Sequence, residues 1–273
     1  MTRLWRGCTV WFMQKGTRQL LIPVIAAALC GSCRKAPPAE ITPLYQCRIL
    51  RSYPHDGLAF TQGLAFDGGY LYEGTGLYGL SSLRKVGLRS GAVVMSVELP
   101  REYFGEGVAI AGDRIAQLTW HEGVGYVYEK ATLERVGQFE YEGEGWGLTW
   151  DGQRWIMSDG TARLRFLDGE TFEEVGGLDV YDENGPVGSL NELEYVEGMI
   201  YANIWPEWVA AMISPETGRV EGWIDLRGVY EPTGRDAIEQ IPNGIAYDPV
   251  EKRLFVTGKL WPYVFEVNVT TGE

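Results

Sequence analysis

Short alternations of apolar and polar residues recur along the chain between about residues 50 and 268. The same apolar register restarts at five places: 62–66, 106–110, 146–150, 191–195 and 243–247. Successive starts are 44, 40, 45 and 52 residues apart. Asp-Gly, Asn-Gly and Thr-Gly turns separate runs of strand length, and no long helical period follows the N-terminal region. This period and texture are typical of the four-stranded blades of a β-propeller.

We therefore expect an all-β fold, a five-bladed β-propeller with one four-stranded blade for each repeat. The fifth repeat contains runs at 253–257 and 263–267 but has no outermost strand of its own. A strand-like segment at about 45–53 precedes the first repeat. We expect this segment to join the last blade and close the ring, because closure removes unpaired strand edges. A β-sandwich is the alternative, although nothing in a sandwich requires this period.

The first residue of each repeat changes while the apolar register behind it is kept. In a propeller the first strand of each blade lines the axis, so these five residues should lie near one mouth of the central channel. A second column follows fourteen residues later, at the end of the next strand, where antiparallel pairing brings it beside the first. The first column is Gln62, Glu106, Trp146, Asn191 and Asn243, and the second is Gly76, Trp120, Gly160, Trp205 and, after a two-residue insertion, Lys259.

The two columns predict a site with one acid, one lysine, three tryptophans and several amides. Each member has an ordinary alternative. A propeller tryptophan is more often core, Glu106 and Lys259 would suit a solvated surface, and Asn191 would suit a turn. Two observations favour a site: tryptophan alternates with glycine in one column, and all the members agree in register.

Several chemistries have no signature in this sequence. His55 and His121 are the only histidines and do not form a zinc motif, so we expect both to be structural or surface residues. There is also no Gly-x-Ser-x-Gly elbow, Walker loop or dinucleotide fingerprint. Proton transfer by a carboxylate in an aromatic pocket remains the candidate chemistry. Burial there would raise the pKa of Glu106, and Lys259 would lower it.

The net charge of −13 and the isoelectric point of about 4.7 argue against a nucleic-acid partner. Four basic residues precede an apolar run at 20–30, which predicts a secretory signal in 1–33. Two alternatives stay open, lipid attachment at Cys33 and simple cleavage near Ala36. We expect a tether at 34–44, a single catalytic domain at 45–273, and export to the periplasm or cell envelope. Only Cys47 remains in the mature body, so no internal disulfide is expected.

Motifs in all five repeats resemble the plant and bacterial type of glutaminyl-peptide cyclotransferase. They are Phe-Thr-Gln-Gly-Leu at 60–64, Gly-Thr-Gly-Leu-Tyr-Gly at 74–79, Tyr-Phe-Gly-Glu-Gly at 103–107, Gly-Trp-Gly-Leu at 145–148, Ser-Asp-Gly-Thr at 158–161, Leu-Asn-Glu-Leu-Glu-Tyr at 190–195, Ala-Asn-Ile-Trp at 202–205 and Val-Thr-Gly-Lys-Leu-Trp-Pro at 256–262. The resemblance covers about residues 50–268 and itself implies a five-bladed propeller.

The resemblance implies that the α-amine of an N-terminal glutamine attacks its own carboxamide, releasing ammonia and leaving pyroglutamate. It implies that Glu106 is the general acid/base. Other residues match the family's substrate-binding positions: Phe60, Gln62, Phe104, Trp120, Trp146, Asn191, Trp205 and Lys259. The expected partners are peptides and proteins with N-terminal glutamine, acted on by a monomer whose only membrane contact is the lipid anchor.

No cofactor is expected for the chemistry, and the resemblance also implies a structural calcium ion in the central channel, for which the sequence shows no ligand set. The same residues are compatible with two other functions. One is a non-catalytic propeller that binds peptides or glycans at the same aromatic mouth. The other is a calcium-dependent propeller lactonase, against which Lys259 and the lack of a second inward carboxylate in the first column count.

Overall fold

The structure, a computed structural model, describes residues 41–234 and 237–271, and every regular element within these residues is a β-strand. The chain divides into two compact units, Met1–Pro38 and Ala39–Glu273, and all described residues belong to the second. The predicted signal at 1–33, Cys33 and most of the tether lie outside the described residues. Within the described part, no helix has the length and apolar character needed to cross a membrane.

Three sheets contain four strands each, in sequence order and antiparallel. The first contains β2 (Thr61–Asp67), β3 (Tyr70–Thr75), β4 (Ser82–Gly87) and β5 (Val93–Glu98). The second contains β6 (Gly105–Ala111), β7 (Arg114–Thr119), β8 (Val124–Glu129) and β9 (Arg135–Glu140). The third contains β10 (Leu148–Trp150), β11 (Arg154–Met157), β12 (Arg163–Asp168) and β13 (Glu174–Asp179).

The last two repeats share one eight-stranded sheet, in the order β16-β17-β18-β19-β1-β22-β21-β20. Its strands are β1 (Leu44–Pro54), β16 (Leu190–Val196), β17 (Met199–Ile204), β18 (Val209–Ile213), β19 (Val220–Asp225), β20 (Pro242–Asp248), β21 (Arg253–Gly258) and β22 (Tyr263–Thr271). A two-stranded ribbon, β14 (Tyr181–Asp182) and β15 (Gly185–Pro186), lies between the third sheet and β16 in the sequence.

Strand β1 pairs antiparallel with β22 along most of its length and runs parallel to β19 at its first three residues. The predicted pairing of 45–53 with the last repeat is therefore confirmed. Attachment begins slightly earlier, inside the predicted tether, because buried Thr42 donates its hydroxyl to Glu183 Oε2 at 2.6 Å. The all-β, propeller-like class is also as predicted, whereas the number of blades stays a prediction because eight strands form one continuous sheet.

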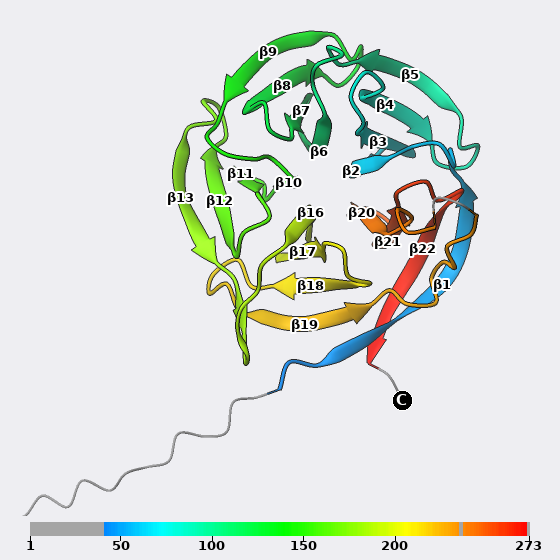
Figure 1. Cartoon of the computed structure of the whole chain (residues 1–273), viewed down its shortest axis with the longest axis vertical. Helices are drawn as coiled ribbons and strands as arrows, with labels where there is room; N and C mark the ends of the chain where they lie inside the picture. Colours follow the sequence, from blue (N-terminus) through cyan, green and yellow to red (C-terminus); the bar gives the residue numbers. More distant parts are fainter. Residues whose placement is uncertain (1–40, 235–236, 272–273) are drawn as a thin grey trace, which may run out of the picture. The chain divides into compact units, whose positions relative to one another are not determined.

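The sheets of this unit are arranged around a central axis (Figure 1). Strands β2, β6, β10, β16 and β20 are innermost, while β5, β9, β13 and β19 lie at the periphery (Figure 1). The inner strands approach one another closely. A Cβ on Gly63 would lie 2.4 Å from the backbone nitrogen of Val108, and one on Gly147 would lie 2.0 Å from the carbonyl oxygen of Asn191. This approach explains the glycine after the first residue of these repeats.

Apolar side chains fill the space between neighbouring sheets. Leu118 from β7 and Trp155 and Met157 from β11 are fully buried in one cluster. Phe172 in the same cluster stacks on Phe139 at 4.0 Å between ring centroids. Burying a leucine or methionine side chain of this kind stabilises the fold by about 1.5–3 kcal/mol. The rings thus fill the inter-sheet space, as their abundance in the sequence predicts, and hold the inner strands in place.

Candidate active site

Four of the five repeats begin with an irregularity in strand pairing. The register between the first and second strands shifts at the positions that hold Gln62, Glu106, Asn191 and Asn243. The fifth, Trp146, lies two residues before β10. A β-bulge inserts a residue and re-aims its side chain away from the regular alternation. Four members of the variable column are therefore bulge residues, which explains why these positions change independently of the packing behind them.

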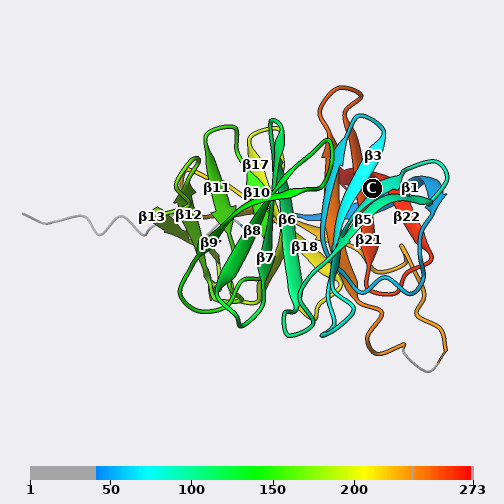
Figure 2. The same ribbon diagram turned by 90° about the horizontal axis from the view of Figure 1, so that it is seen from above.

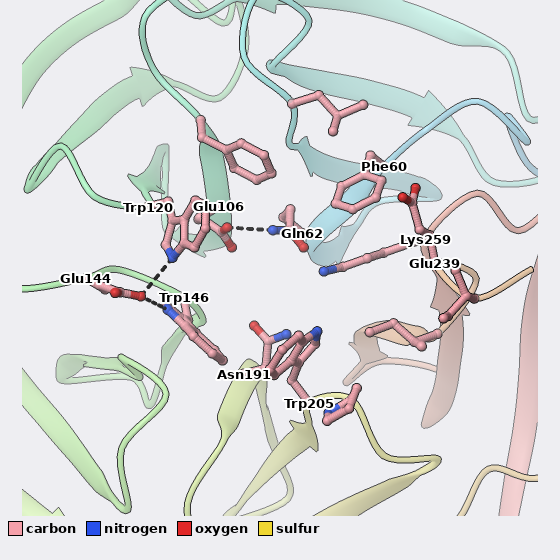
Figure 3. A pocket seen from close by; sticks show the side chains of 15 residues that line it. Phe60, Gln62, Glu106, Trp120, Glu144, Trp146, Asn191, Trp205, Glu239 and Lys259 are labelled. Carbon is pink, nitrogen blue, oxygen red and sulfur yellow. Dashed lines mark hydrogen bonds between the residues drawn. The ribbon is translucent and has the colours of Figure 1, made fainter. Parts of the chain in front are cut away.

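A cavity of about 720 Å³ lies where the inner strands begin. It is lined by residues at the starts of the inner strands and by residues that directly follow the second strands. Every predicted site residue lies on its wall: Phe60, Gln62, Phe104, Glu106, Trp120, Trp146, Asn191, Trp205 and Lys259. Figure 3 shows the polar ends of Glu106, Gln62, Lys259 and Asn191 converging on the same open space. The structure thus brings together all nine residues that the sequence singled out.

The two glycines of the second column make room for rings of the cavity wall, Phe104 and the first-column residue Trp146. A Cβ on Gly76 would lie 2.3 Å from the ring of Phe104, and one on Gly160 would lie 2.8 Å from the indole of Trp146. Gly160 also has a φ of +80°. The alternation of tryptophan with glycine therefore has a steric cause, since each glycine faces a ring that enters the cavity from the neighbouring position.

Glu106 is 3% exposed, so it is not a solvated loop carboxylate. Gln62 Nε2 donates a hydrogen bond to its Oε1 at 2.5 Å, whereas its Oε2 is buried and has no hydrogen-bond partner among the described residues. Burial raises the pKa of Glu106 well above its ordinary value of 4.5, against the opposing effects of Lys259 and the Gln62 hydrogen bond. Glu122 and Glu144 raise this pKa further. The site therefore holds a carboxyl that can exchange a proton at a free oxygen.

Lys259 is 7% exposed, so the surface alternative for this residue is also wrong. Its Nζ lies 4.8 Å from the ring centroid of Phe60, within the range of a cation–π interaction. Burial lowers the pKa of Lys259, while Glu106 and Glu239 act in the opposite direction. A partly desolvated ammonium group of this kind is a strong electrostatic partner for an oxygen that gains negative charge.

Edge-to-face ring contacts build the rest of the wall. Phe104 contacts Phe60 and Trp120, with centroids 6.2 and 5.5 Å apart. Trp146 meets Trp205 at 5.9 Å and an interplanar angle of 86°. Trp205 is 44% exposed and forms the outer rim. Such contacts add stability beyond area burial, and they surround Glu106 with apolar surface.

The sequence profile of the glutamine cyclotransferase family matches residues 23–269. A glutaminyl-peptide cyclotransferase of Arabidopsis thaliana is 40% identical over 230 residues, which cover 82% of this chain and 71% of that protein. This chain belongs to the glutamine cyclotransferase family. The crystal structure of a glutaminyl cyclase of Myxococcus xanthus matches with a TM-score of 0.79 at 39% identity, covering 86% of this chain and 100% of its own. The resemblance predicted from the motifs is confirmed, and with it the class of enzyme.

The cavity of this family member contains six residues that were not among the predicted site residues: Leu77, Glu144, Pro206, Ile238, Glu239 and Ile241. The expectation of a single acid was therefore wrong, because three carboxylates line the cavity. Glu239 and both isoleucines come from the segment between β19 and β20, which extends beyond the strand ends (Figure 2). This segment follows no repeat, so periodicity gave no signal for it.

Glu144 positions two of the cavity's indoles. Its Oε2 accepts a hydrogen bond from Trp120 Nε1 at 2.8 Å and from Trp146 Nε1 at 2.7 Å (Figure 3). His121 Nδ1 lies 3.4 Å from the other oxygen of Glu144. A usable signal was present, since Glu144 stands between two glycines as Glu106 does, but it falls two residues before the repeat column.

His55 is a buried structural residue, as predicted. Its Nδ1 donates to the carbonyl oxygen of Trp261 at 2.6 Å, and its Nε2 lies 2.9 Å from Glu73 Oε1. Burial opposes the charged form of His55, but Glu73 and the Trp261 carbonyl outweigh it and raise the pKa of His55. The same pairing outweighs burial at Glu73 and lowers the pKa of that carboxyl. This ion pair holds Trp261 two residues after Lys259. His121 has a half-exposed side chain, which also agrees with the prediction.

A buried carboxylate, Glu192, lies among the inner strands, where the resemblance implies a calcium ion. Buried Glu192 accepts the backbone N–H of Leu64 at Oε1 and that of Ile245 at Oε2. These N–H groups have the opposite polarity to the oxygen ligands that calcium requires. Across residues 41–234 and 237–271, no group of three or more His, Cys, Asp or Glu residues is placed to hold a metal ion. Both oxygens of Glu192 are thus engaged by the backbone, and calcium in the central channel stays a prediction.

Proposed function

We propose that this chain converts the N-terminal glutamine of peptides and proteins to pyroglutamate and releases ammonia. The observation that carries the proposal is a buried carboxyl, Glu106, in the wall of an aromatic cavity of a glutamine cyclotransferase family member. Its Oε2 has no hydrogen-bond partner in the part of the chain that the structure describes. The name of the Arabidopsis relative, a glutaminyl-peptide cyclotransferase, supports the same reaction.

In the proposed mechanism the α-amine attacks the side-chain carbonyl carbon of the same glutamine. One C–N bond forms to close the five-membered ring, and the bond to the carboxamide nitrogen breaks. Glu106 Oε2 takes a proton from the attacking amine and delivers it to the departing nitrogen, which leaves as ammonia. The carboxylate is regenerated in each cycle. General acid–base catalysis of this kind contributes on the order of 10²–10⁴-fold.

The remaining residues hold the folded-back conformer and stabilise the developing oxyanion. Asn191 and Lys259 bring donors to the cavity from the side opposite Trp120 (Figure 3). They would bind the carboxamide oxygen, where negative charge grows in the transition state. The rings fix the glutamine side chain, which suits an intramolecular reaction limited by orientation. Gln62 is already engaged by Glu106, so its first role is to orient the catalytic carboxyl.

We also propose that the eight-stranded sheet comprises two blades, β16 to β19 and β20 to β22 with β1, joined through the short parallel contact of β1 with β19. With the three separate sheets this gives five blades. The sequence at 1–33 supports export to the periplasm or cell envelope, with Cys33 as the point of lipid attachment and 34–44 as the tether. Mass spectrometry of the mature N-terminus tests this placement, since a diacylated Cys33 and a free terminus near Ala36 differ in mass.

Ammonia release from Gln-initiated dipeptides and longer peptides tests the function, with Asn- and Glu-initiated peptides as controls. The proposal predicts release only from the Gln series, with loss of one ammonia from the peptide mass, and turnover that survives a chelator. If no Gln-initiated peptide yields ammonia but such peptides bind, the cavity is a binding site without catalysis. Lactone hydrolysis that disappears with the chelator would identify a lactonase instead.

A further inference from the structure

Asn243 begins the fifth repeat but does not line the cavity. Its side chain is fully buried, so the expectation that this member of the first column lies at the channel mouth is wrong. Asn243 Nδ2 donates to the carbonyl oxygen of Thr61 at 3.0 Å and to Gln62 Oε1 at 3.0 Å. It therefore lies directly behind Gln62, on the side away from Glu106.

These contacts determine which way the Gln62 amide faces. A backbone carbonyl can only accept a hydrogen bond, so the atom of Asn243 next to Thr61 must be its nitrogen. That nitrogen also meets Gln62, which must present its oxygen in return. Gln62 Nε2 is then the atom that faces Glu106, at 2.5 Å from Oε1. One backbone carbonyl thus fixes the direction of two successive side-chain amides, those of Asn243 and Gln62.

The oxygen of Asn243 supports a directed role. Asn243 Oδ1 is buried and has no hydrogen-bond partner in the described structure. An unsatisfied buried acceptor is costly, and few occur in native proteins. Both N–H donors of the Asn243 amide are engaged, one with the backbone and one with Gln62.

We infer that Asn243 is a positioning residue that locks the Gln62 amide, so that Gln62 always donates to Oε1 of Glu106 and Oε2 alone meets the substrate amine. The inference rests on the proposed role of Glu106. Without Asn243 the Gln62 amide can turn over and present its oxygen to Glu106. A carboxylate repels that oxygen, and only a protonated carboxyl can donate to it. Loss of Asn243 therefore favours the protonated form, which cannot act as a base.

The other charged or titratable groups around Glu106 come from different elements and are not changed by substitution of Asn243. Lys259 follows β21, Glu122 follows β7, and Glu144 follows β9. Tyr78 and Tyr141 also sense the charge of Glu106. A shift in the protonation of Glu106 on removal of Asn243 alone is therefore attributable to the Gln62 contact.

The test compares Asn243→Leu with Asn203→Leu. Asn203 is also buried and accepts the backbone N–H of Gly244 at Oδ1, but in the described part of the chain it has no hydrogen bond to Gln62. We expect Asn243→Leu to move the acid limb of kcat/KM upward by about one pH unit, the size expected for loss of one hydrogen bond to a charged group. Asn203→Leu should lower stability but leave that limb in place. An unmoved limb in Asn243→Leu, or an equal shift in Asn203→Leu, overturns the inference.

A second readout does not depend on turnover. The infrared carboxyl band of Glu106, isolated by subtracting the spectrum of the matching Glu106→Gln protein, titrates this group directly in each variant. The pH midpoint of this titration should rise in Asn243→Leu only, whether or not the wild type releases ammonia. Failure of the proposed function is therefore distinguished from failure of this inference. If Asn243→Leu does not fold, Asn243→Asp with Asn203→Asp as its control takes its place. The inference is overturned if Asn243→Asp raises the pKa of Glu106 no more than Asn203→Asp does.

Discussion

The side-chain amide of Gln62 donates to Oε1 of Glu106, and Oε2 of the same carboxyl has no hydrogen-bond partner within residues 41–234 and 237–271. One oxygen is thereby assigned to the protein and the other to the ligand. This division matches a group that must receive a proton at one point and return it at another. It also keeps the carboxyl from rotating freely inside the aromatic wall, which benefits a reaction limited by geometry.

The raised pKa of Glu106 predicts the acid limb of the pH profile. Only the carboxylate accepts a proton from the substrate amine, so kcat/KM should fall as pH is lowered through the pKa of Glu106 in the free enzyme. Because burial places this pKa well above 4.5, the fall should begin far above the ordinary range of a glutamate. A pH profile with a glutamine dipeptide measures it. A limb near pH 4.5, or activity unchanged down to that pH, contradicts the assignment.

Glu144 should act through the two indoles that it orients. Glu144→Leu removes the acceptor shared by Trp120 and Trp146 and should lower kcat/KM by about 10–100-fold, because small displacements of positioning groups are costly. Glu144→Gln keeps an oxygen that both N–H groups can reach and should stay within a few-fold of wild type. The indole N–H resonances of Trp120 and Trp146 should shift in the leucine variant. Equal losses in the two variants would point to the charge of Glu144 instead.

The His55–Glu73 pair should stabilise the fold most strongly at mildly acidic pH. The folded pKa of His55 is raised above 6.5, so its contribution is complete below pH 6.5 and is lost as pH rises through the folded value. The folded pKa of Glu73 is lowered below 4.5, so its contribution is complete above pH 4.5 and is lost as pH falls through the folded value. Thermal melts of His55→Gln should show the largest loss between these pH values and a smaller loss at pH 9.

The matched control for that series is His121→Gln, which removes a half-exposed imidazole. Substitutions at such positions change stability by little, within about 0.5 kcal/mol. A pH-independent loss in His55→Gln, or a comparable loss in His121→Gln, would show that the buried ion pair is not the source of the stability.

Replacing Glu194 and Glu192 by glutamine should change the melting temperature in opposite directions. Burial raises the pKa of Glu194 to about 8, so this group costs stability increasingly as pH rises from 4.5 towards 8. Glu194→Gln keeps an acceptor for the Tyr247 N–H and offers a donor to Thr149 Oγ1. Its melting temperature should equal that of wild type near pH 4.5 and exceed it at pH 8, by about 2–4 °C per kcal/mol gained.

Glu192→Gln should instead lower the melting temperature at every pH. Both oxygens of Glu192 accept backbone N–H groups, so the new amide nitrogen must face one of those donors. Thermal melts of both variants across pH 4.5–8 settle the comparison. A Glu194→Gln protein that is less stable than wild type at pH 8 would contradict the electrostatic account of Glu194.

The repeat pattern predicted the propeller-like class, the closing strand and the cavity residues of the two columns, because these follow from periodicity. Phe60 and Phe104 were predicted from the family resemblance instead. A residue that varies inside a fixed apolar register, such as Glu106 or Asn191, is visible as an exception to packing. The same reasoning wrongly included Asn243 among the residues at the channel mouth. A bulge can turn a side chain sideways into the neighbouring repeat as well as towards the mouth. The register gave no means of telling these two directions apart.

The missed residues have a different origin. Glu144 lies outside both columns, and it matters through hydrogen bonds to side chains that come from two sheets. Glu239 and Ile238 lie in a connection with no repeat counterpart. Tertiary contacts of this type have no periodic trace, because they depend on where a loop returns in space. The number of carboxylates in the cavity was therefore underestimated.

The most direct test of the central claim is the rate of ammonia release from a glutamine dipeptide by Glu106→Gln. The substitution keeps the shape of the side chain and an acceptor for Gln62 Nε2, and it removes only the exchangeable proton site. Glu122→Gln is the control, since Glu122 is a nearby carboxyl that does not line the cavity. The account predicts a loss of about 10²–10⁴-fold in kcat for folded Glu106→Gln and near-normal turnover for Glu122→Gln. Retention of more than about a tenth of wild-type kcat by folded Glu106→Gln would contradict it.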